Sequence, residues 1–459
     1  MQKKTIKAAI ATNRFGLGAA PGELETAAQG EREWLLQQMT PLLFSTSRPD
    51  AALALQLIKD SKALAKKKQS EKNDQTKTEI KKSSEFGEML KPNYVRNTTV
   101  ADTVQHGVSA ENSLSWRLLD FFSNHFSVSA QGRPMSYLAP TLERDAIAPH
   151  LYGQFEDLLV AVSTHPAMLV YLNNEQSIGP NSPEGKRRKN RGLNENLARE
   201  ILELHTLGVK GGYTQDDVIE LAKAITGWSV IKPGKDRDKS KSGFIFRANN
   251  HEPGTRSLLG KKYPPQGLEQ GTAILRDLAK HPATASFLSY KLARHFVADV
   301  PPPSLVETLR KTWLKTGGNI RAVVSAMITD DASWHEQAQK YKTPREFFIS
   351  AARATKPDGI TDRYVVYSLR ELGQSPFSAG SPAGFSDISA GWDGADALYA
   401  RLQWSSQFAK RLRVEDAVAV ADSALGDSVS NATRTAIRRA ESRTQALAIL
   451  LMSPEFLRR

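Results

Sequence analysis

The stretch from Leu193 to Trp228 constrains the fold more than any other part of this chain. It holds two runs in which apolar residues recur at helical spacing, separated by a segment that contains Gly208, Gly211 and Gly212. Apolar residues three and four positions apart line one face of an α-helix, and glycine suits the left-handed position that ends one. The stretch therefore predicts two amphipathic helices joined by a tight turn.

The start of the second helix is well specified. Thr214 precedes Asp217 by three residues, which is the spacing of a capping box. Gln215 and Asp216 fall in the first turn, where a carboxylate complements the helix dipole. We therefore expect the second helix to begin after Thr214, with Gly208 as the C-cap of the first.

The first helix divides into two faces on a helical wheel of about 100° per residue. His205 falls in the apolar arc, and the charged residues fill the opposite arc. One interpretation is a surface helix with salt bridges at i,i+4 spacing. The other is a helix packed on both sides, whose carboxylates line a cleft or bind a metal. The polar arc consists of Glu195, Asn196, Arg199, Glu200 and Glu203.

Helical periodicity recurs along most of the chain and favours, for example, one helix over about 100–128. The predicted fold class is mainly α, a multi-helix orthogonal array, with one short β-hairpin near 230–246. We expect four regions: an N-terminal helical segment (1–65), a charged flexible linker or insertion (66–92), a central helical core with the candidate site (93–345), and a C-terminal helical region packed on that core (346–459).

Composition excludes several classes of site. The chain has no cysteine, which excludes disulfides, cysteine-ligated zinc, iron–sulfur clusters and cysteine nucleophiles. The net charge is +13, and lysines are concentrated between residues 62 and 91. Acidic residues are interspersed with these lysines and aromatic residues are scarce, which favours a solvated insertion and argues against nucleic acid as a partner.

The N-terminus and the hydropathy pattern bear on localisation. The apolar run from Ala8 to Ala11 is too short for the core of a signal peptide. No stretch approaches the roughly 20 apolar residues that a transmembrane helix needs. As given, the sequence predicts a cytoplasmic protein, with a periplasmic or exported location as the alternative. Its oligomeric state is not determined by these patterns.

Several motifs together resemble the bacterial family known as domain of unknown function 1800. The resemblance implies no activity, because that family is uncharacterised. It does imply a partner, since a phosphatase-like protein is often encoded beside members of the family. The motifs are Asn13-Arg14-Phe15-Gly16, Phe122-Ser123-Asn124-His125-Phe126, His165-Pro166-Ala167-Met168, Asn194-Glu195-Asn196-Leu197-Ala198-Arg199-Glu200, Gly212-Tyr213-Thr214-Gln215-Asp216, Thr226-Gly227-Trp228, His281-Pro282-Ala283-Thr284-Ala285 and Ser453-Pro454-Glu455-Phe456.

Our first hypothesis is an uncharacterised enzyme, for example a metal-assisted hydrolase, with a polar site built on the Asn194–His205 helix. The candidate catalytic residues are His125, His205, Glu203 and Arg199. The candidate substrate-binding residues are Asn124, Asn194, Asn196, Gln215 and Asp216. No pair of histidines has His-Glu-x-x-His spacing, so a divalent metal would need ligands from separate segments, such as Glu200 and His251.

The alternative hypothesis is a non-enzymatic helical scaffold or accessory protein that binds a partner hydrolase or an anionic polymer. The surroundings of the polar arc distinguish the two hypotheses. Carboxylates that point into a concave pocket beside His125 or His251 favour the enzyme. Carboxylates that form an exposed ladder, next to a dry apolar pocket, favour the scaffold.

Overall fold

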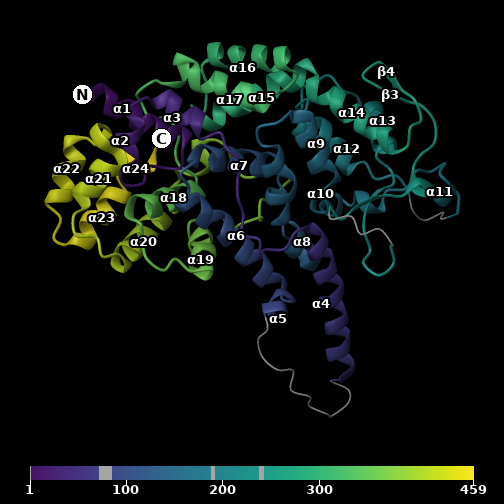
Figure 1. Ribbon diagram of the computed structural model, residues 1–459, viewed down its shortest axis with the longest axis horizontal. Coiled ribbons are helices and arrows are strands. Elements are labelled where there is room, and N and C mark those ends of the chain that lie inside the picture. The colour runs from purple at the N-terminus through teal and green to yellow at the C-terminus, as the bar shows by residue number, and fades with distance from the viewer. Residues whose placement is uncertain (1, 72–84, 188–191, 237–241) are drawn as a thin grey trace.

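A computed structural model describes residues 2–71, 85–187, 192–236 and 242–459 of the chain (Figure 1). Helices predominate, and the described strands form two small antiparallel hairpins. The mainly α fold class is therefore confirmed. No helix in the described ranges is both long enough and apolar enough to span a membrane.

The first third of the chain supplies the N-terminal helices and a projecting arm. Figure 1 shows the arm extending from the body, with α4 on one side and α5 with the start of α6 on the other. The helices are α1 (Gln2–Ile10), α2 (Glu23–Ala27), α3 (Glu31–Gln37), α4 (Ala51–Glu71), α5 (Glu85–Met89), α6 (Pro92–Ser109), α7 (Ser113–His125) and α8 (Gly132–Leu138).

The arm includes the segment predicted as a flexible linker, 66–92, together with the earlier part of α4. Residues 66–71 continue α4, and α5 occupies Glu85–Met89. The rest of that prediction, residues 72–84, lies outside the described residues.

The middle of the chain holds further helices and both hairpins. The helices are α9 (Phe155–Thr164), α10 (Pro166–Tyr171), α11 (Pro183–Arg187), α12 (Asn196–Glu200), α13 (Gln215–Ala224), α14 (Leu268–Lys280), α15 (Pro282–Phe296), α16 (Pro303–Thr316) and α17 (Ile320–Thr329). Strand β1 (Trp228–Val230) pairs with β2 (Phe244–Phe246), which confirms the predicted hairpin. A second hairpin, β3 (Arg256–Leu258) with β4 (Lys261–Tyr263), was not predicted.

The C-terminal helices return to the N-terminus. They are α18 (Pro344–Thr355), α19 (Asp362–Glu371), α20 (Ala395–Arg411), α21 (Ala417–Leu425), α22 (Asn431–Arg438), α23 (Arg443–Leu451) and α24 (Pro454–Leu457). Both ends of the chain lie in the same part of the molecule, where α1 contacts α21 (Figure 1). One hydrophobic cluster extends from Ile10 to Leu457, so the predicted central and C-terminal regions share a core.

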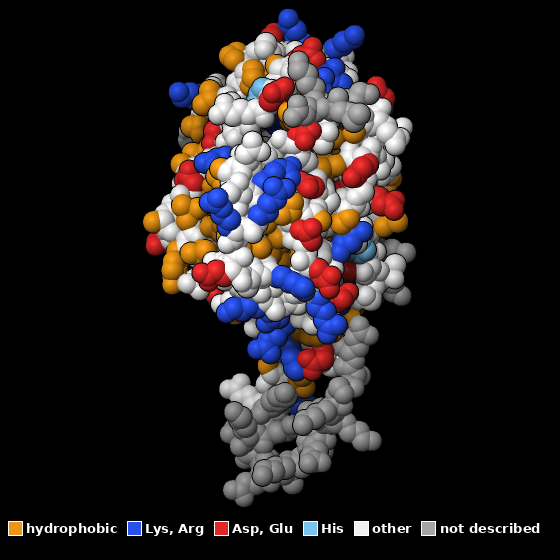
Figure 2. Space-filling view, turned by 90° about the vertical axis from the view of Figure 1, so that its left-hand side faces the viewer, with side chains coloured by type: hydrophobic (Ala, Val, Ile, Leu, Met, Phe, Trp, Pro, Cys, Tyr) orange, Lys and Arg blue, Asp and Glu red, His pale blue; other side chains and the backbone are white. Residues whose placement is uncertain are grey.

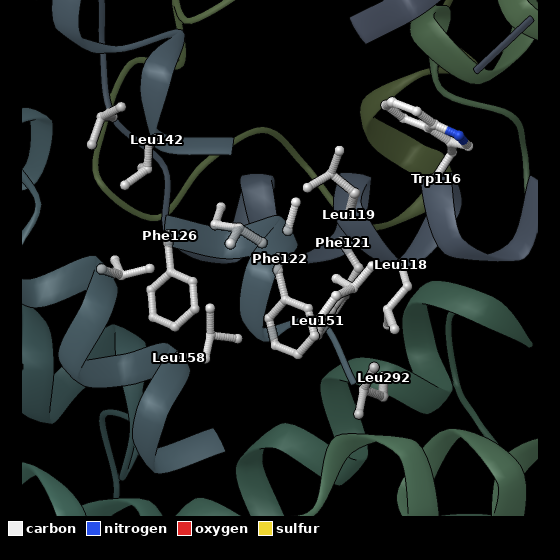
Figure 3. Packing of buried hydrophobic residues seen from close by; sticks show 14 of the residues in the cluster. Trp116, Leu118, Leu119, Phe121, Phe122, Phe126, Leu142, Leu151, Leu158 and Leu292 are labelled. Atoms are coloured by element: carbon white, nitrogen blue, oxygen red, sulfur yellow. The ribbon is translucent and has the colours of Figure 1, made fainter. Parts of the chain in front are cut away.

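Helix α7 lies at the centre of that core. Leu118 and Phe122 are fully buried, and Figure 3 shows them surrounded by side chains of other elements, including Leu158 and Leu292. Burying a leucine or phenylalanine side chain contributes about 1.5–3 kcal/mol. The packing therefore fixes α7, and with it the direction of the polar residues on its other faces.

The single helix predicted over 100–128 is wrong, because α6 and α7 are separate helices. Ala110, between them, has extended backbone angles. The Asn112 side chain donates to Thr40 Oγ1 (2.8 Å), and the Leu114 amide donates to Gln38 Oε1 (3.1 Å). These contacts from the segment after α3 satisfy the start of α7, which an isolated helical pattern does not reveal.

The start of the second helix in the Leu193–Trp228 stretch forms as predicted. The C-cap predicted at Gly208 is wrong, because the preceding helix ends at His205 and Thr206 is its C-cap. Thr214 and Asp217 make a reciprocal capping box, and Gly208 has φ +82°. The helix before it differs from the prediction, because residues Ile201–His205 form a π-helix after α12. A π-turn rotates the residues that follow relative to a regular wheel.

Candidate functional site

The polar arc of the Asn194–His205 helix forms a ladder at the surface. Arg199 Nη2 donates to Glu195 Oε2 (3.1 Å) and to Gln215 Oε1 (2.9 Å). Gln215 Nε2 also donates to Glu195 Oε2 (2.9 Å). The side chains of Arg199 and Glu195 are 41% and 34% exposed, so the ladder resembles the surface interpretation of this arc.

The remaining carboxylates of this helix are half-buried near two tyrosines. Burial, followed by repulsion from Glu203, raises the pKa of Glu200. The pKa of Tyr171 is raised by burial and by the charge of Glu200. The Tyr213 hydroxyl donates to Glu203 Oε2 at 3.5 Å. Glu200 and Glu203 are thus neighbours, as their spacing predicts.

Three other candidates, Asn194, Asn196 and Asp216, lie at the starts of helices. Asn194 Oδ1 accepts a hydrogen bond from the Asn196 amide (2.9 Å) at the start of α12. Asp216 is exposed in the first turn of α13. Their positions explain all three residues as features of helix starts.

His251 lies in a different environment from Glu200. Its Nδ1 is 3.1 Å from the Thr226 carbonyl oxygen, and its ring lies edge-on to Phe246. Burial lowers its pKa. Within the described ranges, no group of three or more His, Asp or Glu side chains is placed to hold a metal ion.

The two candidate catalytic histidines, by contrast, are brought together in the interior. His125 and His205 are 2% and 1% exposed, and their ring centroids lie 6.2 Å apart. Lys291 Nζ on α15 is 3.2 Å from His125 Nδ1, and His125 Nε2 is 3.2 Å from the His205 carbonyl oxygen. Because Lys291 donates to Nδ1, the neutral His125 ring carries its proton on Nε2 and donates it to that carbonyl.

The charge states around this pair follow from burial. Burial holds the pKa of His125 well below its usual value, and the nearby charge of Lys291 adds to this effect. The same two causes lower the pKa of His205 to about 3. Burial also lowers the pKa of Lys291 to about 8, although Asp387 opposes the shift. Both ring nitrogens of His205 lack a hydrogen-bond partner among the described residues.

Asn124, the residue before His125, lies beside two adjoining cavities. One cavity, of about 60 Å³, extends along α7 towards Glu143 and Arg345. The other, of about 40 Å³, extends towards Lys340. Both are lined by Asp120, Asn124, Gln374 and Phe385, so they meet at the C-terminal half of α7.

The loop of residues 374–392 covers both cavities. Asn124 Nδ2 donates to the Phe385 carbonyl oxygen (3.0 Å), and the Phe385 amide donates to Asn124 Oδ1 (2.8 Å). Phe377 has φ +50°, a left-handed conformation that is strained for a side chain of this size, and its carbonyl oxygen accepts from the Ala130 amide (2.7 Å). The loop is therefore fastened to α7 and to the segment after it at two points.

The first cavity contains an ion-pair network. Arg345 lies between Asp120 (Nε to Oδ1, 3.2 Å) and Glu143 (Nη1 to Oε1, 3.4 Å). Burial raises the pKa of Asp120, and the positive charge of Arg345 only partly offsets it. Ser123 Oγ donates to Glu143 Oε1 (2.6 Å), which orients that second carboxylate.

The second cavity contains a lysine and a histidine with shifted pKa values. Lys340 Nζ donates to Asp299 Oδ1 (2.7 Å) and to the Asp387 carbonyl oxygen (2.5 Å). Burial, followed by the charge of Arg459, lowers the pKa of Lys340 to about 8. Burial also holds the pKa of His295 well below its usual value, and His295 Nε2 has no partner in the described part of the chain.

Comparison with known families matches residues 10–458 to the family described as protein of unknown function (DUF1800). The chain belongs to the DUF1800 family. This confirms the resemblance that the sequence motifs indicate. Searches of curated proteins and of solved structures found no match.

Most polar residues of these cavities in this DUF1800 member were missed by sequence reasoning. Asp120 is one of several polar positions on α7, and Arg345 lies inside the Thr343–Glu346 capping box. Two signals point in the right direction: Asn124 at the end of α7, and the long loop between α19 and α20. Loops of such length are often functional. Neither signal identifies Lys340 or Arg345 as a partner.

Proposed function

We propose that this chain is a hydrolase that uses acid–base chemistry in the two cavities between α7, α18 and the 374–392 loop. The supporting observation is that Asp120, with a raised pKa, lines the same cavity as Lys340, with a pKa lowered to about 8. Titratable groups with shifted pKa values in a concave pocket are characteristic of active sites.

The charge of the lining favours a neutral substrate. Three carboxylates line the two cavities: Asp120, Glu143 and Asp387. Three cations balance their charge: Arg345, Lys340 and Arg459. An anionic substrate would disturb this balance, whereas a neutral ester, amide or glycoside would not. We therefore propose that the cleaved bond belongs to a neutral polar molecule, of which only the reacting group enters these small cavities.

The proposed roles follow from the contacts of each group. The Asp120 carboxylate accepts a proton from a water molecule as that water attacks the bond, because a raised pKa makes the carboxylate a stronger base. Lys340 has two of its three donors occupied by Asp299 and Asp387, so one remains to donate to the leaving group. Water supplies the proton and the hydroxyl that the two products gain.

We propose a positioning role for the buried histidines. His125 accepts from Lys291, and the charge of Lys291 in turn acts on Asp387 at the second cavity. In this scheme His125 and His205 set the position of a charge near the site. Neither ring contacts the substrate.

The experiment compares wild type with Asp120→Asn and Lys340→Met on a panel of neutral chromogenic esters, amides and glycosides. Glu307→Gln is the matched control, because it makes the same carboxylate-to-amide change in an exposed ion pair with Arg310. We expect the wild type and the control to hydrolyse one substrate class, and each site variant to lose at least about a hundredfold in kcat, the lower end for a general acid or base.

Two outcomes would contradict this proposal. One is full activity in the Asp120→Asn protein. The other is a folded wild type that hydrolyses nothing in the panel, which would support the scaffold alternative.

A specific surface favours that alternative, in which the chain is an accessory protein for a phosphatase-like partner. Tyr367 on α19 and Leu398, Tyr399 and Leu402 on α20 are 47%, 37%, 64% and 47% exposed. On the face that Figure 2 shows, basic and acidic side chains are interspersed, which does not suit a polyanion. The accessory role predicts that the purified phosphatase-like neighbour binds the wild type and not a Leu402→Glu variant.

A further inference from the structure

An open groove lies at the break between α6 and α7. It has a volume of about 760 Å³, within the range of small-molecule sites, and it is formed by α3, the segment after α3 and the residues around Asn112. It shares no lining residue with the cavities of the proposed hydrolase. What binds there is therefore a separate question from that proposed function.

One wall of the groove is a fixed pair of rings. The His106 ring stacks on Trp116 with centroids 5.5 Å apart and an interplanar angle of 3°, and Phe44 lies edge-on to Trp116. His106 Nε2 is 3.7 Å from Asp102 Oδ1 and 3.3 Å from Ser45 Oγ. These contacts hold the imidazole parallel to the indole, so this wall is flat before any ligand arrives.

The groove also offers a half-buried indole and several side-chain amides. Trp34 lines it, together with Gln37, Gln38 and Asn112. Gln38 is 5% exposed, and its Oε1 accepts from the Leu114 amide (3.1 Å). Gln38 Nε2 has no hydrogen-bond partner among the described residues, which is costly for a buried donor. A ligand hydroxyl would satisfy it.

The charge of the groove narrows the class of ligand. The chain has 62 lysines and arginines, yet none lines this groove among the described residues, and Glu111 is its one carboxylate there. Nucleic acids and other polyanions are bound through cations. An aromatic wall with amides and hydroxyls, but without cations, suits a neutral molecule that has both apolar ring faces and many hydroxyls.

We infer that the groove is a binding site for a neutral oligosaccharide. The C–H faces of a sugar ring would pack on Trp34 and on His106, whose ring is held in place by the buried Trp116. Its hydroxyls would bond with Gln37, Gln38 and Asn112, whose amides both donate and accept. Aromatic side chains dominate binding energies where they are well packed, so Trp34 is expected to be the most sensitive position.

Calorimetric titration with hexamers of β-1,4-glucose, α-1,4-glucose and β-1,4-N-acetylglucosamine tests the inference on the full-length protein. We expect one hexamer to bind wild type, and Trp34→Ala to weaken its Kd at least about tenfold. Gln37→Ala changes an exposed side chain and is not expected to affect folding; it should weaken binding by a few fold. Tyr290→Ala, a change in an exposed aromatic outside the groove, is the control and should bind as wild type does.

Several outcomes would overturn the inference. These are no heat with any of the hexamers at millimolar concentration, wild-type affinity in both groove variants, or binding only to an anionic oligosaccharide with loss at high salt. The Asp120→Asn variant separates the two proposals, because it should bind the hexamer normally even if hydrolysis fails.

Discussion

Replacing Glu346 with glutamine tests the buried charge network beside the cavities. Glu346 is 2% exposed at the start of α18. It accepts from Arg117 Nη2 (2.8 Å) and from Arg459 Nη2 and Nε (3.1 and 3.2 Å). Burial alone would raise the pKa of this carboxyl, but the two guanidinium groups outweigh burial and hold the pKa well below its usual range.

The expected loss of stability follows from what remains after the change. Glutamine keeps an oxygen that can accept from the Thr343 amide, so the capping box survives. Arg117 and Arg459, 1% and 4% exposed, would lose their shared counter-charge. Removing one partner of a buried ion pair costs about 3–5 kcal/mol. Against a typical total of about 5–15 kcal/mol, this is a large share of the free energy of unfolding.

Urea unfolding of wild type and Glu346→Gln from pH 7 to pH 3 measures this loss. Because the folded-state pKa of Glu346 is lowered, its contribution is complete above the unfolded pKa of about 4.5 and declines as the pH falls below it. The difference between the two proteins should therefore narrow by up to about 1.4 kcal/mol per pH unit below pH 4.5.

Glu195→Gln provides the matched control, since it makes the same change in the surface ladder with Arg199, and should cost about 0.2–1 kcal/mol. The placement of Glu346 between two arginines would be refuted by a loss at pH 7 no larger than that of the control. A difference that does not change with pH would refute it equally.

Two further predictions concern the histidine pair and the loop. His205→Leu should leave the free energy of unfolding at pH 7 unchanged or raise it, because both ring nitrogens are unpaired in the described structure. Burial lowers the pKa of His205 in the folded protein to about 3, whereas its usual value is 6.5. As the pH falls below 6.5, the His205 ring is therefore protonated in the unfolded chain before it is protonated in the folded protein, and this destabilises the wild type. The leucine variant should thus lose stability less steeply between pH 6.5 and 4 in urea titrations, by up to about 1.4 kcal/mol per pH unit, and equal slopes would contradict the assignment. Gly384→Ala should destabilise the 374–392 loop by about 1–3 kcal/mol, because Gly384 has φ +86° and an added Cβ would lie 2.5 Å from the Asn124 carbonyl oxygen. Hydrogen exchange of the Phe385 amide should then be faster than in Gly380→Ala, where nothing lies within 4 Å of the added Cβ; equal protection would show that the loop is not held by Asn124.

The helices and their ends were predictable because local contacts determine them. The capping box at Thr214 and the positive φ of Gly208 depend on residues a few positions apart. The burial of His205 followed from its place in an apolar arc. The β1–β2 hairpin likewise followed from two short apolar runs.

The candidate site was only partly predictable for the opposite reason. His125 and His205 were both selected from their motifs, but 80 positions separate them and the sequence does not show that they meet. The pattern of polar residues on α12 could not tell a surface ladder from a cleft, since both need the same spacing. In the structure, the Glu195–Arg199–Gln215 contacts lie at the surface.

The sequence by itself thus determined a mainly helical protein, its family, and where many of its helices begin and end. Only the tertiary structure decided which polar groups share a cavity. Asp120, Arg345 and Lys340 come from two distant parts of the chain, and each is unremarkable in its own segment. The pKa values of Asp120 and Lys340 shift because packing around α7 removes water from both, and that desolvation is a property of the assembled core.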